Sequence, residues 1–226
     1  MAYTAVIPVR AGSTRVKDKN IRPFAGSSLL EVKIEQLKRI SYIDQIVVSS
    51  DSEQMLELAT CKGVMAIRRP IEYCDEKSKS FNEVVRYIAQ EQVSTEDMMW
   101  VPCVCPLLED NSIIKAMEIY ECIKRGEISN DSLVSAKLLQ EYVFDEHGPI
   151  NFSVDHHVPS QRLPRWHTIQ NGFFIAPRIK MIEWGFVYGR NPFLYEIDDF
   201  QLLDIDNQEQ FEIAELLYLR RNGKQD

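Results

Sequence analysis

Residues 5–20 read Ala5-Val6-Ile7-Pro8-Val9-Arg10-Ala11-Gly12-Ser13-Thr14-Arg15-Val16-Lys17-Asp18-Lys19-Asn20, an apolar run followed by a basic loop. The apolar run predicts a short buried strand, which Pro8 and Gly12 then interrupt. Phosphate groups need backbone N–H groups that can approach closely and cations that offset their charge. Gly12 and Ser13 offer the close approach, and the charge comes from four side chains: Arg10, Arg15, Lys17 and Lys19. The stretch therefore predicts a strand that ends in a phosphate-binding loop, the alternative being an ordinary solvated surface loop.

Two other phosphate-binding folds are not indicated. The sequence contains no Gly-x-Gly-x-x-Gly after a predicted strand and no Gly-x-x-x-x-Gly-Lys-Ser/Thr. Those patterns would carry a dinucleotide site or a P-loop, because their glycines let the backbone approach phosphate. Both interpretations lose their main support.

The composition of the chain limits which kinds of partner it can bind. The chain has 226 residues, 45% apolar and 27% charged, which is ordinary for a globular protein with a sizeable core. Its formal net charge of −8 attracts neither nucleic acid nor an anionic membrane, so we expect neither partner. No apolar stretch is long enough to span a membrane and no signal-peptide pattern precedes the first strand, so we expect a cytoplasmic protein.

The cysteines and histidines predict no metal centre. Five cysteines fit reduced thiols better than a disulfide framework. Cys103 and Cys105 would share one face of a strand, but no second cysteine pair or nearby histidine completes a ligand set, so we expect both to be buried core residues. The histidines lack ligand spacing on a helix: His147, His156, His157 and His167.

Strand and helix patterns alternate along the chain. Apolar runs predict strands near residues 5–7, 45–49, 64–67, 97–101 and 133–136. Helical periodicity predicts helices at 29–40, 53–59, 80–90, 112–124 and 209–221, the first capped by Ser27 or Ser28 and the fourth by Asp110 or Asn111. This alternation predicts an α/β sheet with parallel pairs and helical crossovers.

Polar groups follow three of the predicted strands. They are the Arg10 loop, Asp51 and Arg69. In such sheets ligands lie beyond the carboxyl ends of the strands, so these groups are candidates for binding. Asp51 is interpreted mainly as the N-cap of the following helix.

A carboxylate pair lies near the end of the sequence, in Leu203-Asp204-Ile205-Asp206-Asn207. On an extended segment Asp204 and Asp206 point the same way while Ile205 packs inward. Two carboxylates so placed repel each other and favour a hard cation such as Mg²⁺. The alternative is that Asp206 or Asn207 only caps the last helix.

These motifs resemble the acylneuraminate cytidylyltransferases, which make CMP-activated nonulosonic acids. The resemblance covers most of the chain and is carried, in order, by Ile7–Asn20, Val48–Glu53, Arg69–Glu72, Gln161–Pro164, Asn171–Ile175 and Leu203–Asp206. It implies a three-layer, Rossmann-like nucleotidyltransferase sheet that is mostly parallel, with a small dimerisation lobe. Residues 1–226 would form a single nucleotidyltransferase domain, and 141–166 would be an inserted segment that completes the sugar site of a homodimer.

The resemblance also implies a reaction: the anomeric hydroxyl of a nonulosonic, sialic-acid-like sugar acid attacks the α-phosphorus of CTP, and pyrophosphate leaves. Catalytic roles would fall to Arg10, Lys19 and Asp206. CTP would be held by Ala11, Gly12, Ser13, Arg15, Asn20, Arg69 and Ser80, and Mg²⁺ by Asp204 and Asp206. The sugar would be held by Gln161, Arg162, Arg165 and Asn171, with Arg162 or Arg165 taking its carboxylate in a bidentate way.

Three departures from the family pattern bear on the acceptor. Relatives carry Leu-Gln-Pro-Thr-Ser-Pro-Leu-Arg where this chain has apolar residues at 101–108, Ser160 stands at an arginine position, and Thr14-Arg15 resembles enzymes that activate 3-deoxy-octulosonic acid. Loss of polar groups next to a sugar is expected to change which sugar is accepted. The alternatives are therefore a nucleotidyltransferase for another sugar acid or another nucleotide, or a relative that binds without turnover.

Overall fold

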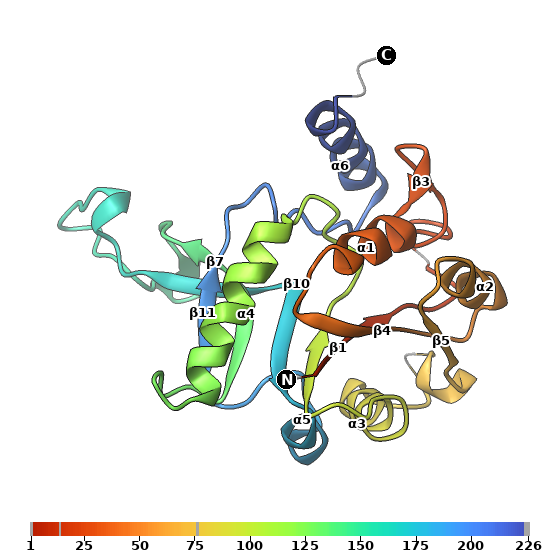
Figure 1. The fold of residues 1–226 in the computed structure, drawn as a ribbon. Coiled ribbons are helices and arrows are strands. Elements are labelled where there is room, and N and C mark those ends of the chain that lie inside the picture. The colour runs from red at the N-terminus through yellow and green to blue at the C-terminus, as the bar shows by residue number, and fades with distance from the viewer. Residues whose placement is uncertain (1, 14, 76, 224–226) are drawn as a thin grey trace.

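The computed structural model describes residues 2–13, 15–75 and 77–223. Within these ranges the chain forms a seven-stranded sheet with the order β11-β7-β10-β6-β1-β4-β5. Figure 1 shows the sheet with helices on both of its faces. The strands of this sheet are β1 (Tyr3–Pro8), β4 (Ile43–Ser50), β5 (Met65–Arg68), β6 (Asp97–Trp100), β7 (Ser132–Leu139), β10 (Trp166–Pro177) and β11 (Pro192–Glu196).

The sheet is mostly parallel, as the sequence predicts. β1 pairs in parallel with both β4 and β6, β4 with β5, and β7 with β11. β10 is the exception, because it runs antiparallel to β6 and to β7. The antiparallel strand brings its first half to the same edge of the sheet at which the parallel strands end. The predicted α/β fold class is confirmed.

Helices cover the two faces of the sheet. They are α1 (Leu29–Lys38), α2 (Glu53–Cys61), α3 (Phe81–Glu91), α4 (Asp110–Lys124), α5 (Arg178–Trp184) and α6 (Gln208–Arg221), with 3-10 turns at Ile71–Tyr73 and Ser160–Arg162. Side chains of β1 alternate between the faces: Ala5 and Ile7 pack in the core beneath α1 and α4, and Val6 packs in the core beneath α3 and α5. Both faces are therefore buried, which explains the uninterrupted apolar runs of the inner strands.

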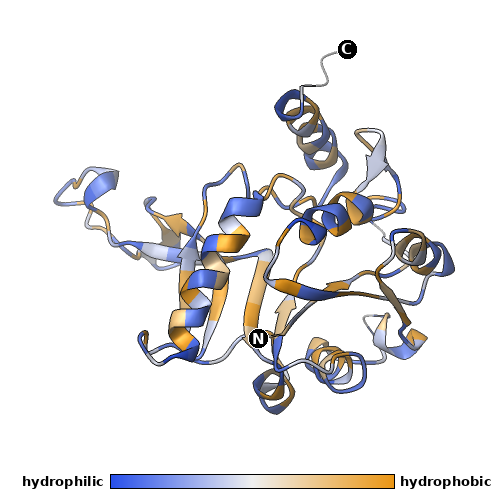
Figure 2. Ribbon diagram, viewed as in Figure 1, coloured by the Kyte–Doolittle hydropathy of each residue, from blue (hydrophilic) through white to orange (hydrophobic). Residues whose placement is uncertain are grey.

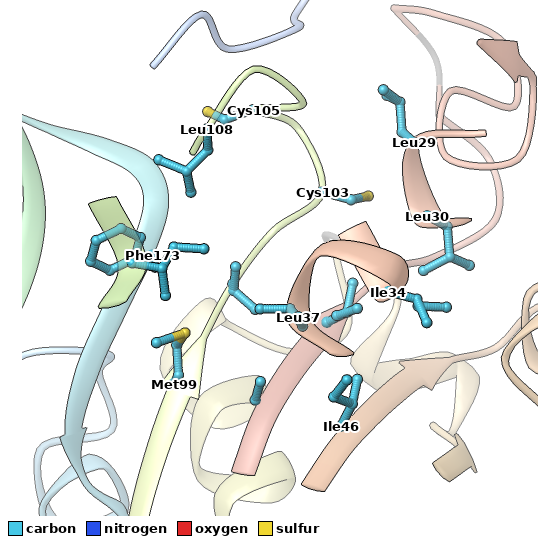
Figure 3. Packing of buried hydrophobic residues seen from close by; sticks show 14 of the residues in the cluster. Leu29, Leu30, Ile34, Leu37, Ile46, Met99, Cys103, Cys105, Leu108 and Phe173 are labelled. Carbon is cyan, nitrogen blue, oxygen red and sulfur yellow. The ribbon is translucent and has the colours of Figure 1, made fainter. Parts of the chain in front are cut away.

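The larger core lies between the sheet and helices α1, α2, α4 and α6. Figure 3 shows α1 contributing Leu30, Ile34 and Leu37 to this core, with Met99 coming from β6. Figure 2 shows hydrophobic residues along the strands and hydrophilic ones on the outer sides of the helices. The third layer is formed by α3 and α5, which pack on the other face.

The predicted helix starts are partly confirmed. Ser28 caps α1 by accepting from the N–H of Glu31 at 3.2 Å. Asp110 and Asn111 do not cap the fourth helix: α4 already starts at Asp110, and Glu109 occupies the cap position without a side-chain bond. The prediction failed there because Asp110 instead accepts hydrogen bonds from two side chains far away in the sequence, Gln36 of α1 and Arg39 directly after it.

Residues 141–166 leave the body of the protein as a projecting arm (Figure 1). This arm holds the two-residue strands β8 (Phe144–Asp145) and β9 (Gly148–Pro149), and a similar short pair, β2 (Pro23–Phe24) and β3 (Ser27–Ser28), precedes α1. Large apolar side chains of the arm are exposed: Tyr142, Phe144, Ile150 and Val154.

Candidate active site

A cleft of about 810 Å³ opens at the carboxyl ends of β1 and β6. A smaller hollow of about 460 Å³ shares residues of the basic loop with it. The polar residues around the cleft include Arg10, Arg15, Lys19, Arg69, Lys79, Ser80, Asn171, Asp204 and Asp206. Residues from both ends of the chain, such as Arg10 and Asp206, thus face one cavity.

Asp51, which follows β4, accepts a hydrogen bond from the backbone of the basic loop after β1. The Ala11 backbone N–H donates to Asp51 Oδ1 at 2.9 Å, and Val9 N–H donates to the carbonyl of Ser49 at 3.0 Å. Asp51 is therefore not the helix cap that its position favours. Ser52 is the N-cap of α2, and it makes no side-chain cap bond. The Asp51 carboxylate anchors the loop instead.

The loop leaves room for a ligand. Gly12 has a φ of +73° and is exposed, and a Cβ built there meets no atom within 4 Å. Arg10 and Lys19 are half-buried and Arg15 is exposed, so three cations project from the loop toward the cleft. Thr14, at which the sequence departs from the family pattern, lies outside the described residues.

The carboxylate pair lies directly beside the basic loop. Arg15 Nη1 is 2.8 Å from Asp206 Oδ1, and Lys19 Nζ donates to the carbonyl of Ile205 at 2.5 Å. Ile205 itself is buried, and its N–H donates to the carbonyl of Val104 at 3.1 Å. The residue between the two carboxylates is thereby fixed at both of its backbone groups, which holds both carboxylates at the cleft.

Asp204 and Asp206 have different environments. Asp204 Oδ2 accepts from Asn171 Nδ2 at 2.8 Å. Burial raises the pKa of the Asp204 carboxyl, the Asn171 bond lowers it, and the nearby negative charge of Asp206 raises it again. Asn207, not Asp206, caps α6, with its side chain accepting from the N–H of Gln210 at 2.9 Å. Of the two predicted caps, the structure therefore selects Asn207, and Asp206 faces the loop.

Arg69 lines the cleft next to the basic loop. Its side chain is buried, with 4% of the residue exposed, and Nη2 donates to the carbonyl of Val9 at 2.8 Å. Its Nε donates to Cys74 Sγ at 3.0 Å. Asn20 is also buried and accepts from the thiol of Cys103 at 3.2 Å. Ser80 lines the cleft, but its hydroxyl is engaged in the capping box of α3.

Within 101–108, four positions hold apolar residues where the relatives carry polar ones, and the structure places these four side chains in two different environments. Pro102 and Val104 line the cleft. Cys105 and Leu108 lie in the hydrophobic core, as Figure 3 shows, with 0% and 3% exposed. Of the apolar residues at 102, 104, 105 and 108 that replace polar residues of the relatives, Cys105 and Leu108 therefore do not face the cleft. These residues belong to a turn after β6, and a turn does not keep the alternation of a strand.

The cysteines behave as the sequence predicts. Cys103 and Cys105 are buried free thiols, and burial raises their pKa values to about 11 and about 12. Within the described residues no group of three or more His, Cys, Asp or Glu side chains could hold a metal ion by itself.

The predicted sugar-binding residues are spread over two places. Asn171 lines the cleft. Within the described part of this single chain, the lining of the cleft does not include Gln161, Arg162 or Arg165. Arg165 lies instead against Glu196, with Nη2 2.6 Å from Oε1 and 2.8 Å from Oε2.

An aromatic group at the cleft was missed by sequence reasoning. Its members come from α3, β6, β10 and the loop between α5 and β11: Phe81, Trp100, Phe174, Phe186 and Tyr188. The rings of Phe81 and Phe186 meet edge to face, with centroids 5.5 Å apart, and those of Phe186 and Tyr188 at 4.8 Å. The only local signal was the aromatic pair of Phe186 and Tyr188 after a glycine.

Comparisons with known proteins agree on one family. A family model described as Cytidylyltransferase matches residues 4–145. The N-acylneuraminate cytidylyltransferase of Escherichia coli O18:K1:H7 is 24% identical over 220 residues, which are 96% of this chain and 52% of that protein. The chain therefore spans about half the length of this relative. The pseudaminic acid cytidylyltransferase of Campylobacter jejuni (strain 81-176) is 25% identical over 224 residues, covering 96% of this chain and 97% of that protein.

The fold has solved counterparts as well. The structure of a CMP:2-keto-3-deoxy-manno-octonic acid synthetase complexed with CTP superposes with a TM-score of 0.70 at 12% identity, covering 98% of this chain and all of that chain. A 4-diphosphocytidyl-2C-methyl-D-erythritol synthase from Anaerococcus prevotii superposes with a TM-score of 0.67 at 13% identity, covering 97% of this chain and 96% of that chain. Among the described residues, no helix is both long and apolar enough to cross a membrane.

Proposed function

The chain belongs to the cytidylyltransferase family, and we propose that it transfers CMP from CTP to the anomeric hydroxyl of a nonulosonic sugar acid, releasing pyrophosphate. One observation carries this proposal: three cations of the loop after β1 and two carboxylates from before α6 line the same cleft. Nucleotidyl transfer depends on positioning and on charge stabilisation, and this arrangement supplies both.

The nucleotide would lie along the loop. Backbone N–H groups of Gly12 and Ser13 would approach the phosphates, and Arg10, Arg15 and Lys19 would offset their charge. The N–H of Ala11, the third predicted contact, already donates to Asp51 and is not available to a phosphate. Asn20, Arg69 and Ser80 would hold the nucleoside. The Asp51 anchor supports this role, because it fixes the backbone of the loop at Ala11, directly before Gly12.

The two carboxylates fit Mg²⁺. Asp204 and Asp206 provide hard oxygen donors on either side of a fixed Ile205, and fewer than three protein ligands suit a cation that keeps waters and phosphate oxygens in its shell. When bound, Mg²⁺ would polarise the α-phosphate. Arg15 pairs with Asp206, and we propose that Arg15 turns to the phosphates when CTP and Mg²⁺ bind.

The acceptor would enter beside Asn171, whose amide is held by Asp204. We propose that residues 1–226 act as one nucleotidyltransferase domain and that the arm at 141–166 reaches the cleft of a second copy. Two observations support this: the arm exposes large apolar side chains, and Gln161, Arg162 and Arg165 lie away from the cleft of their own chain. We place the reaction in the cytoplasm, where free thiols such as Cys103 and Cys105 stay reduced.

The first test measures pyrophosphate release with Mg²⁺, crossing CTP, UTP, GTP and ATP against eight- and nine-carbon 2-keto sugar acids. We expect release only with CTP and a nine-carbon acid. Release with an eight-carbon acid alone would move the assignment to the octulosonate class. Nucleotide binding without turnover on any acid would support a non-catalytic relative.

Two matched variants test whether the carboxylates before α6 take part in the reaction. Asp206→Asn should lower turnover by about a hundredfold or more. Asp199→Asn should leave turnover unchanged, because Asp199 pairs with Lys137 at 3.0 Å outside the cleft. The dimer is tested by mixing Asp206→Asn with the double variant Arg162→Ala/Arg165→Ala. If the arm acts on the partner's cleft, mixed dimers recover part of the activity that each variant lacks, and no recovery would contradict it.

A further inference from the structure

A thiol and an amide meet in the smaller hollow beside the basic loop. Cys103 and Asn20 both line this hollow, and they are 2% and 7% exposed. The thiol of Cys103 donates to Asn20 Oδ1 at 3.2 Å, across 83 positions of the sequence. In the family motif that residues 101–108 resemble, the position of Cys103 is a proline, which has no side-chain donor. The contact therefore depends on a residue at which this chain departs from the motif.

The backbone of Asn20 is fixed, so only the orientation of its amide is left to be set. Its carbonyl accepts from the N–H of Leu30 at 3.0 Å, which ties it to the first turn of α1. A side-chain amide has an acceptor end and a donor end of nearly the same size, so packing alone scarcely distinguishes them. A partner that donates to Oδ1 does distinguish them. It turns the Nδ2 end of the amide away from Cys103.

The Cys103 thiol keeps the proton that this hydrogen bond needs. Burial raises the pKa of Cys103 to about 11, and the charges of Lys19 and Lys33 oppose that rise only in part. The group is therefore a neutral S–H donor at physiological pH, and it holds the amide without bringing a negative charge next to the basic loop.

The donor end of the Asn20 amide has no protein partner. Within the described residues, Nδ2 donates to no backbone or side-chain acceptor. Nδ2 is nevertheless not sealed inside the protein, because the fully buried side-chain N and O atoms without a partner in this part of the chain belong to Ser49, Gln92 and Glu121. It is therefore open to the hollow, which Lys19 and Arg69 also line. An anionic ligand held by these cations meets a free N–H donor.

We infer that Cys103 is a positioning residue for the nucleotide: its thiol holds the Asn20 amide so that Nδ2 donates to an acceptor atom of CTP. This inference rests on the proposed cytidylyl transfer and adds to it a residue that acts only through another. Without the thiol, the amide turns between two orientations, of which one cannot donate to the nucleotide. Loss of this buried hydrogen bond should weaken CTP binding about threefold to tenfold.

The experiment measures the dissociation constant of CTP with Mg²⁺ by calorimetry, in the absence of a sugar acid. It compares the wild type with Cys103→Ser and Cys103→Ala. Serine and alanine have nearly the same volume, so both variants leave a similar cavity and differ in the hydroxyl donor alone. Cys105→Ala is the matched control, because it truncates a buried cysteine that lies in the core and not at either hollow.

We expect Cys103→Ala to raise Kd for CTP at least about threefold, whereas Cys103→Ser and Cys105→Ala stay within about twofold of the wild type. In a double-mutant cycle, Cys103→Ala should have no further effect once Asn20→Ala is present, because the thiol acts through the amide. Equal Kd values for Cys103→Ala and Cys103→Ser would overturn the inference, and so would additive effects in the cycle. If Cys103→Ala does not fold, Cys103→Val takes its place, because it fills the site without a donor.

Steady-state kinetics separate the nucleotide from the acceptor. KM for CTP should follow the Kd values, and KM for the sugar acid should stay the same. A rise confined to KM for the sugar acid would overturn the inference, because it would place Nδ2 against the acceptor. If the wild type binds no CTP and releases no pyrophosphate with any sugar acid, the proposed function itself fails. That result is distinct from CTP binding that does not respond to Cys103.

Discussion

Lys33 is a lysine with no exposed surface, and replacing it by methionine gives a sharp test of the packing beneath the cleft. Its Nζ donates to Gln36 Oε1 at 2.6 Å and to the carbonyl of Cys105 at 3.3 Å. Gln36 in turn donates to the carbonyl of Leu108 at 2.5 Å. This buried pair therefore supports the turn that carries Val104 and, through it, the acidic segment.

Burial makes the charge of Lys33 costly. It lowers the pKa of Lys33 from 10.5 to about 8. Between about pH 8 and pH 10.5 the unfolded chain binds a proton at this site that the folded chain has lost, so the free energy of unfolding rises with pH there. The destabilisation caused by burying the charge of Lys33 is absent above about pH 10.5 and fully present below about pH 8. At about 1.4 kcal/mol per pH unit, it amounts to ~3 kcal/mol.

The Lys33→Met variant lacks this dependence. Below pH 8 it loses the charge cost but leaves two acceptors without a partner, at ~1 kcal/mol or more each, so its stability should lie near that of the wild type. As the pH rises to 10 the wild type should gain ~2–3 kcal/mol relative to the variant. Lys38→Met is the matched control, because Lys38 lies on the exposed side of the same helix.

The measurement is urea unfolding of the three proteins at pH 7, 8, 9 and 10, followed by tryptophan fluorescence. Taking differences from the wild type removes the other groups that titrate in this range. A difference between wild type and Lys33→Met that stays constant from pH 7 to 10 would refute the reasoning, as would an equal slope for Lys38→Met.

Three further outcomes are expected. Asp51→Ala removes the acceptor of the Ala11 N–H, so KM for CTP should rise by about fivefold or more with little change in melting temperature; an unchanged KM would contradict the anchoring role. Asp206→Asn should lower kcat by about a hundredfold or more in the pyrophosphate assay while CTP still binds in calorimetry, and near-normal kcat would remove Asp206 from the mechanism. Gly172→Ala places a Cβ 2.9 Å from Ser135 Oγ, so urea unfolding should show a loss of ~1–3 kcal/mol, and a neutral effect would mean that the neighbouring side chains yield freely.

Local signals were sufficient where a residue acts within its own element. Uninterrupted apolar runs predicted the strands of the first half, because a parallel sheet buries both faces of its strands. Helical periodicity predicted the helices between them. Ser28 and Asn207 cap their helices through bonds to residues three positions away. Such bonds depend on a few neighbouring residues and are visible in the sequence.

The second half was less predictable. The first half of the antiparallel strand β10 mixes polar and apolar residues, and α5 and β11 have only short patterns, so periodicity predicted none of these three elements. β10 tolerates polar residues in its first half because that half leaves the covered part of the sheet and pairs only with the end of β7. Which residues are covered depends on neighbours that are remote in the sequence.

The residues of this chain already specified a basic loop after a buried strand, an acidic pair before the last helix and an α/β sheet with parallel pairs. Each depends on residue type and short-range spacing. Tertiary structure alone decided that Asp51 anchors the loop rather than capping a helix, and that Cys105 and Leu108 lie in the core and not at the cleft. It also decided that aromatic rings from four separate segments gather beside the cleft. These roles depend on atoms brought together from distant parts of the chain, and a carboxylate or a ring is held by whichever partner the folded sheet presents to it.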